Sequence, residues 1–598
     1  MSLSIVYTRA NLGVAAPLVT IEVHLSNGLP AFNLVGLPET TVKESRDRVR
    51  SAIINSDFEF PAKRITVNMA PADLPKGGSR FDLAIAIGII AASEQLKRVD
   101  LSQYEFVGEL ALSGNLRPIQ GALPMAFAAS KSNRQLVLPK SNGDEATLVS
   151  AAQIIAANSL TEVYLHLCNK RKISAHITKK VKVTPSIYGD MSEIVEQQHA
   201  KRALEIAAAG AHNILFFGPA GTGKSMLANR LLSIMPELDE ESALTSASIR
   251  SISGDQICPS TWRNRAFRQP HHTCSAIALV GGGSYPKPGE ISLAHKGVLF
   301  LDELPEFGRH ILDVLREPME TGEINISRAA QKVVYPADFQ LVCAMNPSPT
   351  GDIDDQRSNP DQVLRYLNRI SGPFLDRIDL QVNVPKIDLS KALKIKHQSK
   401  SLIDTKPTNI SSNVHLLKVS SNSELASCID RPYDEIPASG SPISNESSGI
   451  ESSSIESSGI ESSGIESSGI ESSGIESSGI ESSGIESSGI ESSGIESSAI
   501  VKSRVVAAQE RQLKRQGKLN KSLSGSEIEQ YCPLSETESL FLSKAMQSMN
   551  LSMRAYHRTM RVARTIADLA CVERVNQQHL AEALSFRSFD RMLTELTE

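Results

Sequence analysis

Residues 218–225 read GPAGTGKS and follow directly on the apolar run ILFF. This spacing is typical of a phosphate-binding loop, in which glycines let backbone N–H groups turn inward around phosphate oxygens and the next helix adds a partial positive charge. We expect Lys224 to reach the β- and γ-phosphates of ATP and Ser225 to bind Mg²⁺. The loop before them consists of Gly218, Pro219, Ala220, Gly221, Thr222 and Gly223. The pattern therefore predicts a site for ATP and Mg²⁺.

Two carboxylates follow a second apolar run, VLFL, and the first of them stands 77 residues after Ser225. The run predicts a buried strand that delivers Asp302 and Glu303 to its exposed end. Asp302 would hold the metal together with Ser225, and Glu303 would polarise the attacking water. An apolar run that ends in two acids is common by itself, but beside a phosphate loop it predicts ATP hydrolysis.

Two further polar residues complete the expected site. Asn346 ends the predicted strand FQLVCAMN and is placed to orient the water. Arg377, in FLDRIDL, lies on a segment that could project toward a neighbouring subunit and neutralise charge on the γ-phosphate in the transition state. An ordinary ion pair with Asp376 or Asp379 is the alternative. An arginine supplied across an interface would make oligomerisation a condition of activity.

The elements that must position these residues alternate along the chain. Strands are expected at NILFFG, GVLFLDEL and FQLVCAMN, and helices at EQQHAKRALEIAAAG and KSMLANRLLSIM. This alternation around a phosphate loop indicates an α/β fold, with a parallel sheet covered on both faces. Residues 1 to about 185 mix β-rich runs (IVYTRA, LVTIEVHL, RITVNM, QLVLP) with helical stretches, which indicates an α/β or α+β domain. Residues 500–598 are expected to be helical.

Residues 446–500 are a pentapeptide array, ESSGI repeated eleven times with the variants ESSSI and ESSAI. One isoleucine every five residues builds no continuous stripe on a helix, and the serine-rich remainder cannot offset its ordering entropy. We therefore expect a disordered insertion, with a stacked β-solenoid as the alternative. The last unit runs into VKSRVVAAQERQLKRQ, for which Ser497 or Ser498 is a natural helix N-cap.

Composition narrows the class of protein. The net charge is −5, but the array contributes eleven glutamates and no other charged residue, so the rest of the chain carries +6 and permits a polyanionic partner. Seven scattered cysteines without a C-x-x-C suit a reducing compartment. The first residues lack the order of a signal peptide, and the longest apolar run has ten residues, too few to span a membrane. We expect a cytoplasmic protein without a membrane partner.

Several long stretches resemble one family, the magnesium-chelatase-like AAA+ ATPases of the ComM/YifB type. They include AFNLVGLPETTVKESRDRVRSAI, NMAPADLPKGGSRFDLAIAIGIIAAS, FRQPHHTCSAIALVGGGSYPKPGEISLAHKGVLFLDELPEF and RAYHRTMRVARTIADL. The resemblance implies an α/β protein of four parts. These are a Lon-protease-like α/β domain at 1–185, a P-loop AAA+ core at 186–390, the low-complexity insertion at 391–498 and a helical lid at 499–598.

The resemblance also implies a function, that of a DNA helicase which promotes branch migration during natural transformation. It implies a ring of six identical subunits with ATP at the interfaces, in which Asn346 matches the first sensor, Arg377 the arginine finger and Arg554 the second sensor of the lid. The insert GGGSYPKPGEISLAH resembles a hairpin near the central pore, where Lys287 is a candidate for phosphate contact; an ordinary surface lysine is the alternative. We expect binding to branched or single-stranded DNA through its phosphates, without sequence preference.

The sequence departs from the family at a possible metal site. Relatives often carry four thiols suited to zinc after the first-sensor strand. This chain has other residues there, namely Ser348, Thr350, Gln356 and Ser358. His271 and His272 are adjacent and point in different directions on most backbones, so we expect no zinc.

The Lon-like segments also lack the serine and lysine of that protease. When the PK-x-G frames are aligned, the serine position falls on Arg80, one residue from Ser79, and the lysine position falls on Leu123 or Met125. Neither apolar side chain can take a proton. We expect a Lon-like fold without protease activity, reused for DNA binding or ring assembly.

Two other functions stay open at this stage. A chelatase-type ATPase would remodel a protein partner that inserts Mg²⁺ into a porphyrin, although the extra N-terminal domain argues against it. A protein-interaction scaffold would use the acidic serine array to recruit partners. An ATPase assay with branched DNA and deletion of residues 446–498 would separate these functions from a DNA motor.

Overall fold

The computed structural model describes residues 3–36, 40–96, 99–177, 188–283, 286–328, 331–352, 359–386, 496–549 and 551–597. Nearly all of the insertion predicted at 391–498, including its expected disorder, lies outside these residues. Two of the four positions discussed for zinc, Gln356 and Ser358, lie outside them as well.

Seven strands form the first sheet, in the order β3-β4-β2-β1-β5-β8-β9. Their bounds are β1 Leu3–Arg9, β2 Leu18–Ser26, β3 Ala31–Val35, β4 Arg64–Ala70, β5 Tyr104–Phe106, β8 Gln135–Pro139 and β9 Ile154–Ala157. Strand β2 pairs antiparallel with β1 and β4, and the other neighbours are parallel. The four strands expected in this part of the chain are confirmed, and the sheet is mixed. The Lon-like assignment stays a prediction.

Two helices of this part, α1 (Thr40–Asn55) and α2 (Asp82–Ala92), also occur where the sequence predicts helices. Helix α2 packs against β1, β2 and α1. It is buried along almost its whole length. This position explains why its sequence is apolar on every face.

The second sheet carries the nucleotide motif and is wholly parallel, in the order β11-β14-β17-β10-β18. Its strands are β10 Ile214–Phe217, β11 Phe267–Arg268, β14 Val298–Leu301, β17 Gln340–Met345 and β18 Leu380–Asn383. Alternate side chains of β10 enter different cores, Ile214 and Phe216 on one face and Leu215 and Phe217 on the other. A strand buried on both faces reads as an unbroken apolar run. The predicted parallel sheet with two covered faces is therefore confirmed.

The register of this sheet brings the predicted site residues to one edge. Phe217 of β10 pairs with Met345 of β17, and Leu301 of β14 pairs with Cys343. The carboxyl ends of parallel strands meet at the same edge of a sheet, which is where open α/β sheets bind ligands. The phosphate loop, Asp302 and Asn346 directly follow these three strands and are thereby neighbours.

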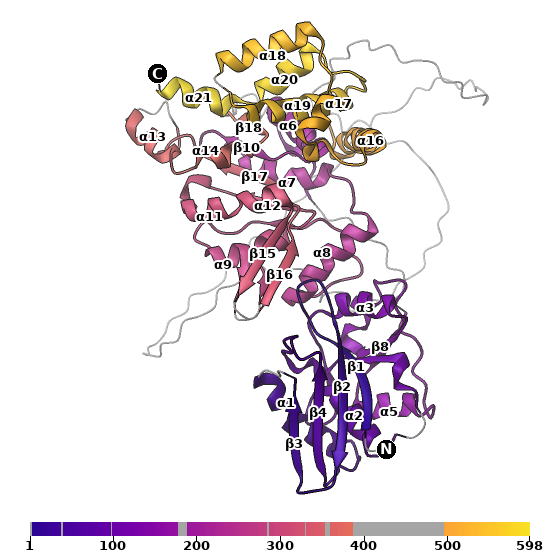
Figure 1. Ribbon diagram of the computed structural model, residues 1–598. Coiled ribbons are helices and arrows are strands. Elements are labelled where there is room, and N and C mark those ends of the chain that lie inside the picture. The colour runs from indigo at the N-terminus through magenta and orange to yellow at the C-terminus, as the bar shows by residue number, and fades with distance from the viewer. Residues whose placement is uncertain are drawn as a thin grey trace, which may run out of the picture. The chain divides into compact units, whose positions relative to one another are not determined.

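The C-terminal part is helical, as predicted. Its helices are α16 Ser498–Gln516, α17 Gly525–Tyr531, α18 Glu536–Ser548, α19 Met553–Leu569, α20 Gln577–Ser585 and α21 Ser588–Thr597. Helices α16 and α19 both pack against α6 (Gln198–Gly210), which precedes β10 (Figure 1). Ser497 is the N-cap of α16, one of the two serines expected there, although its side chain makes no cap hydrogen bond. In the part of the chain that the structure describes, we find no helix with the length and apolar character needed to span a bilayer.

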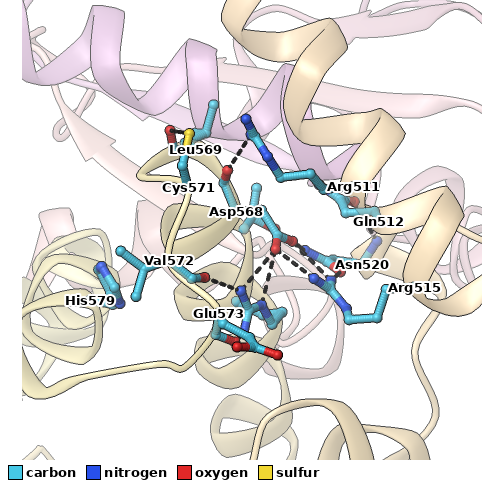
Figure 2. Close-up of polar contacts among 12 residues, drawn as sticks. Arg511, Gln512, Arg515, Asn520, Asp568, Leu569, Cys571, Val572, Glu573 and His579 are labelled. Carbon is cyan, nitrogen blue, oxygen red and sulfur yellow. Dashed lines mark hydrogen bonds and ion pairs between the residues drawn. The ribbon is translucent and has the colours of Figure 1, made fainter. Parts of the chain in front are cut away.

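A buried polar network joins α16 to α19. Figure 2 shows Asp568, near the end of α19, accepting hydrogen bonds from Arg515 of α16 at 2.6 and 2.9 Å and from Asn520 at 2.9 Å. Arg564, one turn before Asp568, donates another at 2.9 Å. A carboxylate that is 1% exposed is tolerated only when its oxygens are satisfied in this way. The network fixes the position of α19, the helix that carries Arg554.

Candidate nucleotide site

The phosphate-binding loop connects β10 to helix α7 (Lys224–Ile234). Gly218 follows the strand, and a Cβ at this position would lie 2.2 Å from the carbonyl oxygen of Val384. Gly223 precedes the helix with φ +86°, a conformation that other residues rarely adopt, and a Cβ there would meet no atom within 4 Å. Gly218 is therefore required because no side chain fits beside Val384. Gly223 is required by its backbone conformation, and it lies beside open space.

Lys224 is the buried cation of this loop. Its residue is 8% exposed, and its Nζ donates hydrogen bonds to the carbonyl oxygens of Gly218 and Pro219, both at 2.8 Å, and to Oδ1 of Asn346 at 3.1 Å. Burial lowers the pKa of Lys224, and the nearby Asp302 carboxylate acts in the opposite direction. The structure thus brings together Lys224 and Asn346, which are 122 residues apart. A desolvated ammonium held mainly by carbonyl groups suits the phosphates of a nucleotide.

Ser225 and Asp302 form a second pair beside Lys224. Oγ of Ser225 donates a hydrogen bond to Oδ2 of Asp302 at 2.9 Å, and Oδ1 of the same carboxylate accepts one from the backbone N–H of Glu303 at 3.0 Å. A hydroxyl and a carboxylate oxygen are hard ligands of the kind that Mg²⁺ binds alongside phosphate oxygens. The residues present therefore fit the predicted Mg²⁺, with Ser225 and Asp302 as its protein ligands.

Glu303 lies at the end of β14, and its side chain is turned toward a histidine. Its backbone has φ +53°, which is uncommon for a residue other than glycine. Its Oε2 lies 3.2 Å from Nδ1 of His272. The adjacent His271 contacts Thr273 instead, with Nδ1 2.8 Å from Oγ1. Sequence analysis considered both histidines only as zinc ligands and missed the contact with Glu303.

Arg377 is held within its own chain. The residue is 7% exposed, and its guanidinium pairs with Glu320 of α12 (Arg316–Thr321) at 2.5 Å and donates to the carbonyl of Pro373 at 2.5 Å. The alternative of a pair with Asp376 or Asp379 is wrong, because the partner is Glu320. Asp379 pairs with Arg558 of α19 at 2.7 Å. Within one chain, the side chain of Arg377, the expected arginine finger, is therefore held by Glu320 and by the carbonyl of Pro373.

Arg554, the residue matched to the second sensor, is exposed on α19, and its charge acts on Arg377. Burial lowers the pKa of Arg377, Glu320 opposes this change, and the positive charges of Arg316, Arg554 and Arg558 lower the pKa further. Neither Arg377 nor Arg554 is among the hydrogen-bond partners of Lys224 or the charges that act on it. Arg377 therefore has neighbouring charges in Arg316, Arg554 and Arg558, and we call these four residues the arginine group.

Two other residues singled out in the sequence make contacts that differ from the expected ones. Lys287 is exposed on a short hairpin formed by β12 (Gly281–Gly282) and β13 (Lys287–Pro288). Ser348 is buried, and its Oγ donates to the carbonyl of Asp352 at 2.7 Å. A phosphate contact for Lys287 and the lack of zinc stay predictions.

The positions aligned with the serine and lysine of Lon proteases have neighbours of other kinds in the structure. Ser79 donates a hydrogen bond from Oγ to the carboxylate of Glu109. Leu123 and Met125 are fully buried in an apolar cluster. Arg80 is half-buried. The lack of protease activity stays a prediction.

Three family models match the sequence. The model for magnesium chelatase, subunit ChlI, matches residues 190–392, and one for subunit ChlI of Mg-chelatase matches residues 21–142. The model for the C-terminal part of the ChlI subunit matches residues 495–587. Together the three models cover most of the chain on both sides of the insertion.

Curated relatives include two proteins that are similar over the full length. The competence protein ComM of Haemophilus influenzae is 46% identical over all of both chains. The protein YifB of Escherichia coli is 44% identical over all of this chain and 99% of its own. The magnesium-chelatase 38 kDa subunit of Rhodobacter capsulatus is 29% identical over 28% of this chain and 52% of its own. The chain is thus similar to ComM and YifB over its full length, whereas its similarity to the chelatase subunit covers only 28% of the chain.

Proposed function

The chain belongs to the ComM/YifB family of magnesium-chelatase-like AAA+ ATPases, and we propose that it is a hexameric motor that hydrolyses ATP to migrate branched DNA. The observation that carries the ATPase part is the grouping at one sheet edge. Buried Lys224 is bonded to Asn346, and beside it Ser225 is bonded to Asp302. These contacts bring three separate segments of the chain together, and they support our proposal of a phosphate and metal site there.

Each residue of this site has a part in the proposed hydrolysis. Lys224 binds the β- and γ-phosphates in place of the carbonyl groups that it now contacts. Mg²⁺, held by Ser225 and Asp302, neutralises charge on the phosphates when bound. Glu303 accepts a proton from the attacking water, and Asn346 orients that water. Gly218 to Gly223 supply backbone N–H groups to the phosphates.

We propose that the active site is completed by a neighbouring subunit. Support comes from the arginine group, in which the charge of Arg554 acts on Arg377, whereas neither arginine is a hydrogen-bond partner of Lys224 in the same chain. Two such cations can act together on a nucleotide bound by the next subunit. Arg377 would then have to leave Glu320, whose carboxylate is 56% exposed and therefore open to competition. Closed rings of identical subunits supply such an interface at every nucleotide.

DNA is the proposed substrate because the similarity to a competence protein covers the whole chain. The charge of +6 outside the array and the exposed Lys287 support a polyanion. We infer contacts with phosphates rather than bases, so that binding is salt-sensitive and indifferent to sequence. The alternative is a chelatase-type ATPase that remodels a protein partner. The names of the matching family models favour this alternative, and the short match to the chelatase subunit weakens it.

The test is ATP hydrolysis by the purified protein with and without a four-way DNA junction at low salt. We expect the junction to raise turnover several-fold and its strands to separate in an ATP-dependent reaction. Lys224→Ala should lose turnover by about 100-fold or more, because it removes the cation that the phosphates need. ATP hydrolysis without any response to DNA would exclude the motor and favour the protein-remodelling alternative. A wild-type protein that does not hydrolyse ATP would refute both.

A further inference from the structure

The segment that carries Arg377 is held by its backbone as well as by its side chain. The carbonyl oxygen of Arg377 accepts hydrogen bonds from Nη1 of Arg558 at 2.8 Å and from Nδ2 of Asn213 at 3.1 Å. Two residues later, the backbone N–H of Asp379 donates to the carbonyl of Asn213 at 3.1 Å. A backbone bonded at both residues cannot shift without the loss of several hydrogen bonds. The backbone of Arg377 is therefore fixed, whereas its guanidinium is paired with the exposed carboxylate of Glu320.

Arg558 holds this segment at two points with a single nitrogen. Besides the carbonyl of Arg377, its Nη1 donates to Oδ1 of Asp379 at 2.7 Å. The other oxygen of this carboxylate, Oδ2, accepts a hydrogen bond from the backbone N–H of Asn213 at 2.9 Å. The side chain of Arg558 is 16% exposed and that of Asp379 is 3% exposed, so water competes little for these bonds. One nitrogen of Arg558 thereby connects α19 to two positions of the segment.

The place of Arg558 on α19 relates it to the residue matched to the second sensor. Arg554 precedes Arg558 by four residues, which is about one turn, so both side chains leave the same face of the helix. Arg554 is exposed, and the charges of both residues act on Arg377. Because a helix keeps its geometry over one turn, the bonds of Arg558 also fix the backbone of Arg377 relative to that of Arg554.

We propose that Arg558 is a positioning residue that sets Arg377 and Arg554 relative to each other, so that both reach the nucleotide of the neighbouring subunit together. This inference rests on the proposed function, in which the active site is shared between subunits. The bonds of Arg558 hold the backbone while the guanidinium of Arg377 exchanges Glu320 for the γ-phosphate. A misplacement of about 1 Å at such a site can slow the chemical step by about 100-fold.

We expect Arg558→Met to lower kcat for ATP hydrolysis by about tenfold or more, because Arg377 loses its backbone support. The Kd for ATP should stay within about twofold of the wild type, since Lys224 and the glycine loop are intact in this variant. The matched control is Arg202→Met. Arg202 of α6 also bonds to a C-terminal helix, through Glu582 of α20 at 2.8 Å, but not at the segment of Arg377. This control should keep kcat within about twofold.

Mixing of variants shows which side of the shared active site Arg558 serves. An Arg558→Met subunit keeps its phosphate loop, and a Lys224→Ala subunit keeps its arginines. Equal amounts of the two should recover about a quarter of wild-type turnover, since about a quarter of the interfaces are then intact. Equal amounts of Arg558→Met and Arg377→Ala should not exceed the mean of the two separate proteins, because both are defective on the arginine side. A general loss of stability would produce no such difference between the two mixtures.

The measurement is steady-state ATP hydrolysis by the separate and mixed variants without DNA, together with their unfolding temperatures. Wild-type kcat for Arg558→Met, or equal results in the two mixtures, would overturn the proposal. The reference is Lys224→Ala mixed with Arg377→Ala. Without recovery in that mixture, the shared active site and this inference both fail, whereas recovery in it alone refutes only the role of Arg558. If Arg558→Met does not fold, Arg558→Met/Asp379→Asn decides by the same mixtures, because it removes both charges of the pair together.

Discussion

Asp379 links the segment of Arg377 to the C-terminal helices by an ion pair in which the carboxylate is buried and the guanidinium of Arg558 is partly buried. Its carboxylate accepts hydrogen bonds from Arg558 at 2.7 Å and from the backbone N–H of Asn213 at 2.9 Å. Burial by itself raises the pKa of Asp379, but Arg558 and His212 more than offset this effect and hold it well below its ordinary value. A buried carboxylate that stays ionised in this way stabilises the folded chain above its unfolded pKa.

The pH dependence of stability should show this contribution. We expect Asp379→Asn to lower the unfolding free energy at pH 7 by about 3 kcal/mol, because it leaves the partly buried guanidinium of Arg558 without its carboxylate. The folded pKa is lower than the unfolded value of about 4, so the contribution is lost as the pH falls below about 4. The difference between wild type and variant in urea unfolding should therefore shrink in acid. A difference that stays constant from pH 7 to pH 3 would contradict this account.

The sequence was sufficient to group these site residues, since the phosphate loop, Asp302 and Asn346 each directly follow an apolar run that predicts a buried strand. Strand order along one sheet edge then brings them together. His272 and Glu320 could not be found in the same way, because their contacts depend on which strands are neighbours and on how α12 packs. The strand β11 has only two residues and gives no periodic signal.

Helix α16 shows how the repeat array meets the folded chain. The last unit of the array is part of the structure, because the backbone N–H of Met191 donates to Oγ of Ser498 at 2.7 Å. The N–H of Ser498 in turn donates to Asp190, and Glu496 pairs with Arg504 at 2.7 Å. The boundary proposed between insertion and lid, after residue 498, therefore falls within a set of native contacts.

Deletions of different length should separate the array from these contacts. We expect removal of residues 446–490 to leave ATP hydrolysis and the unfolding temperature unchanged, because the deletion ends before Glu496. Extension of the deletion through Ser498 should lower the unfolding free energy by about 1–3 kcal/mol, since it leaves the buried N–H of Met191 without a partner. Chemical unfolding of the two deletion proteins measures the difference. Equal stability of both proteins would show that the serine contacts contribute nothing.

Element types were more predictable than their arrangement. The apolar strands β10, β14 and β17 and the long C-terminal helices carry strong patterns, and they occur where expected. Strands β3, β5 and β9 have only three to five residues, and sequence analysis did not name them. Their pairing comes from the surrounding sheet rather than from their own sequence.

The whole molecule is proposed to work only with its neighbours, because neither Arg377 nor Arg554 is a hydrogen-bond partner of Lys224 in the same chain. In one subunit, Arg377 is bound to Glu320 and lies in the charge group that includes Arg554. We infer that this group faces the nucleotide of the next subunit. A subunit that lacks its own Lys224 can then still serve a neighbour whose Lys224 is present.

The most direct test mixes two variants that are each inactive alone, Lys224→Ala and Arg377→Ala. Random assembly of equal amounts places an intact phosphate loop against an intact Arg377 at about a quarter of the interfaces. We predict that ATP hydrolysis by the mixture recovers toward that fraction of wild-type turnover. A mixture that is no more active than the two separate variants would contradict an active site shared between subunits.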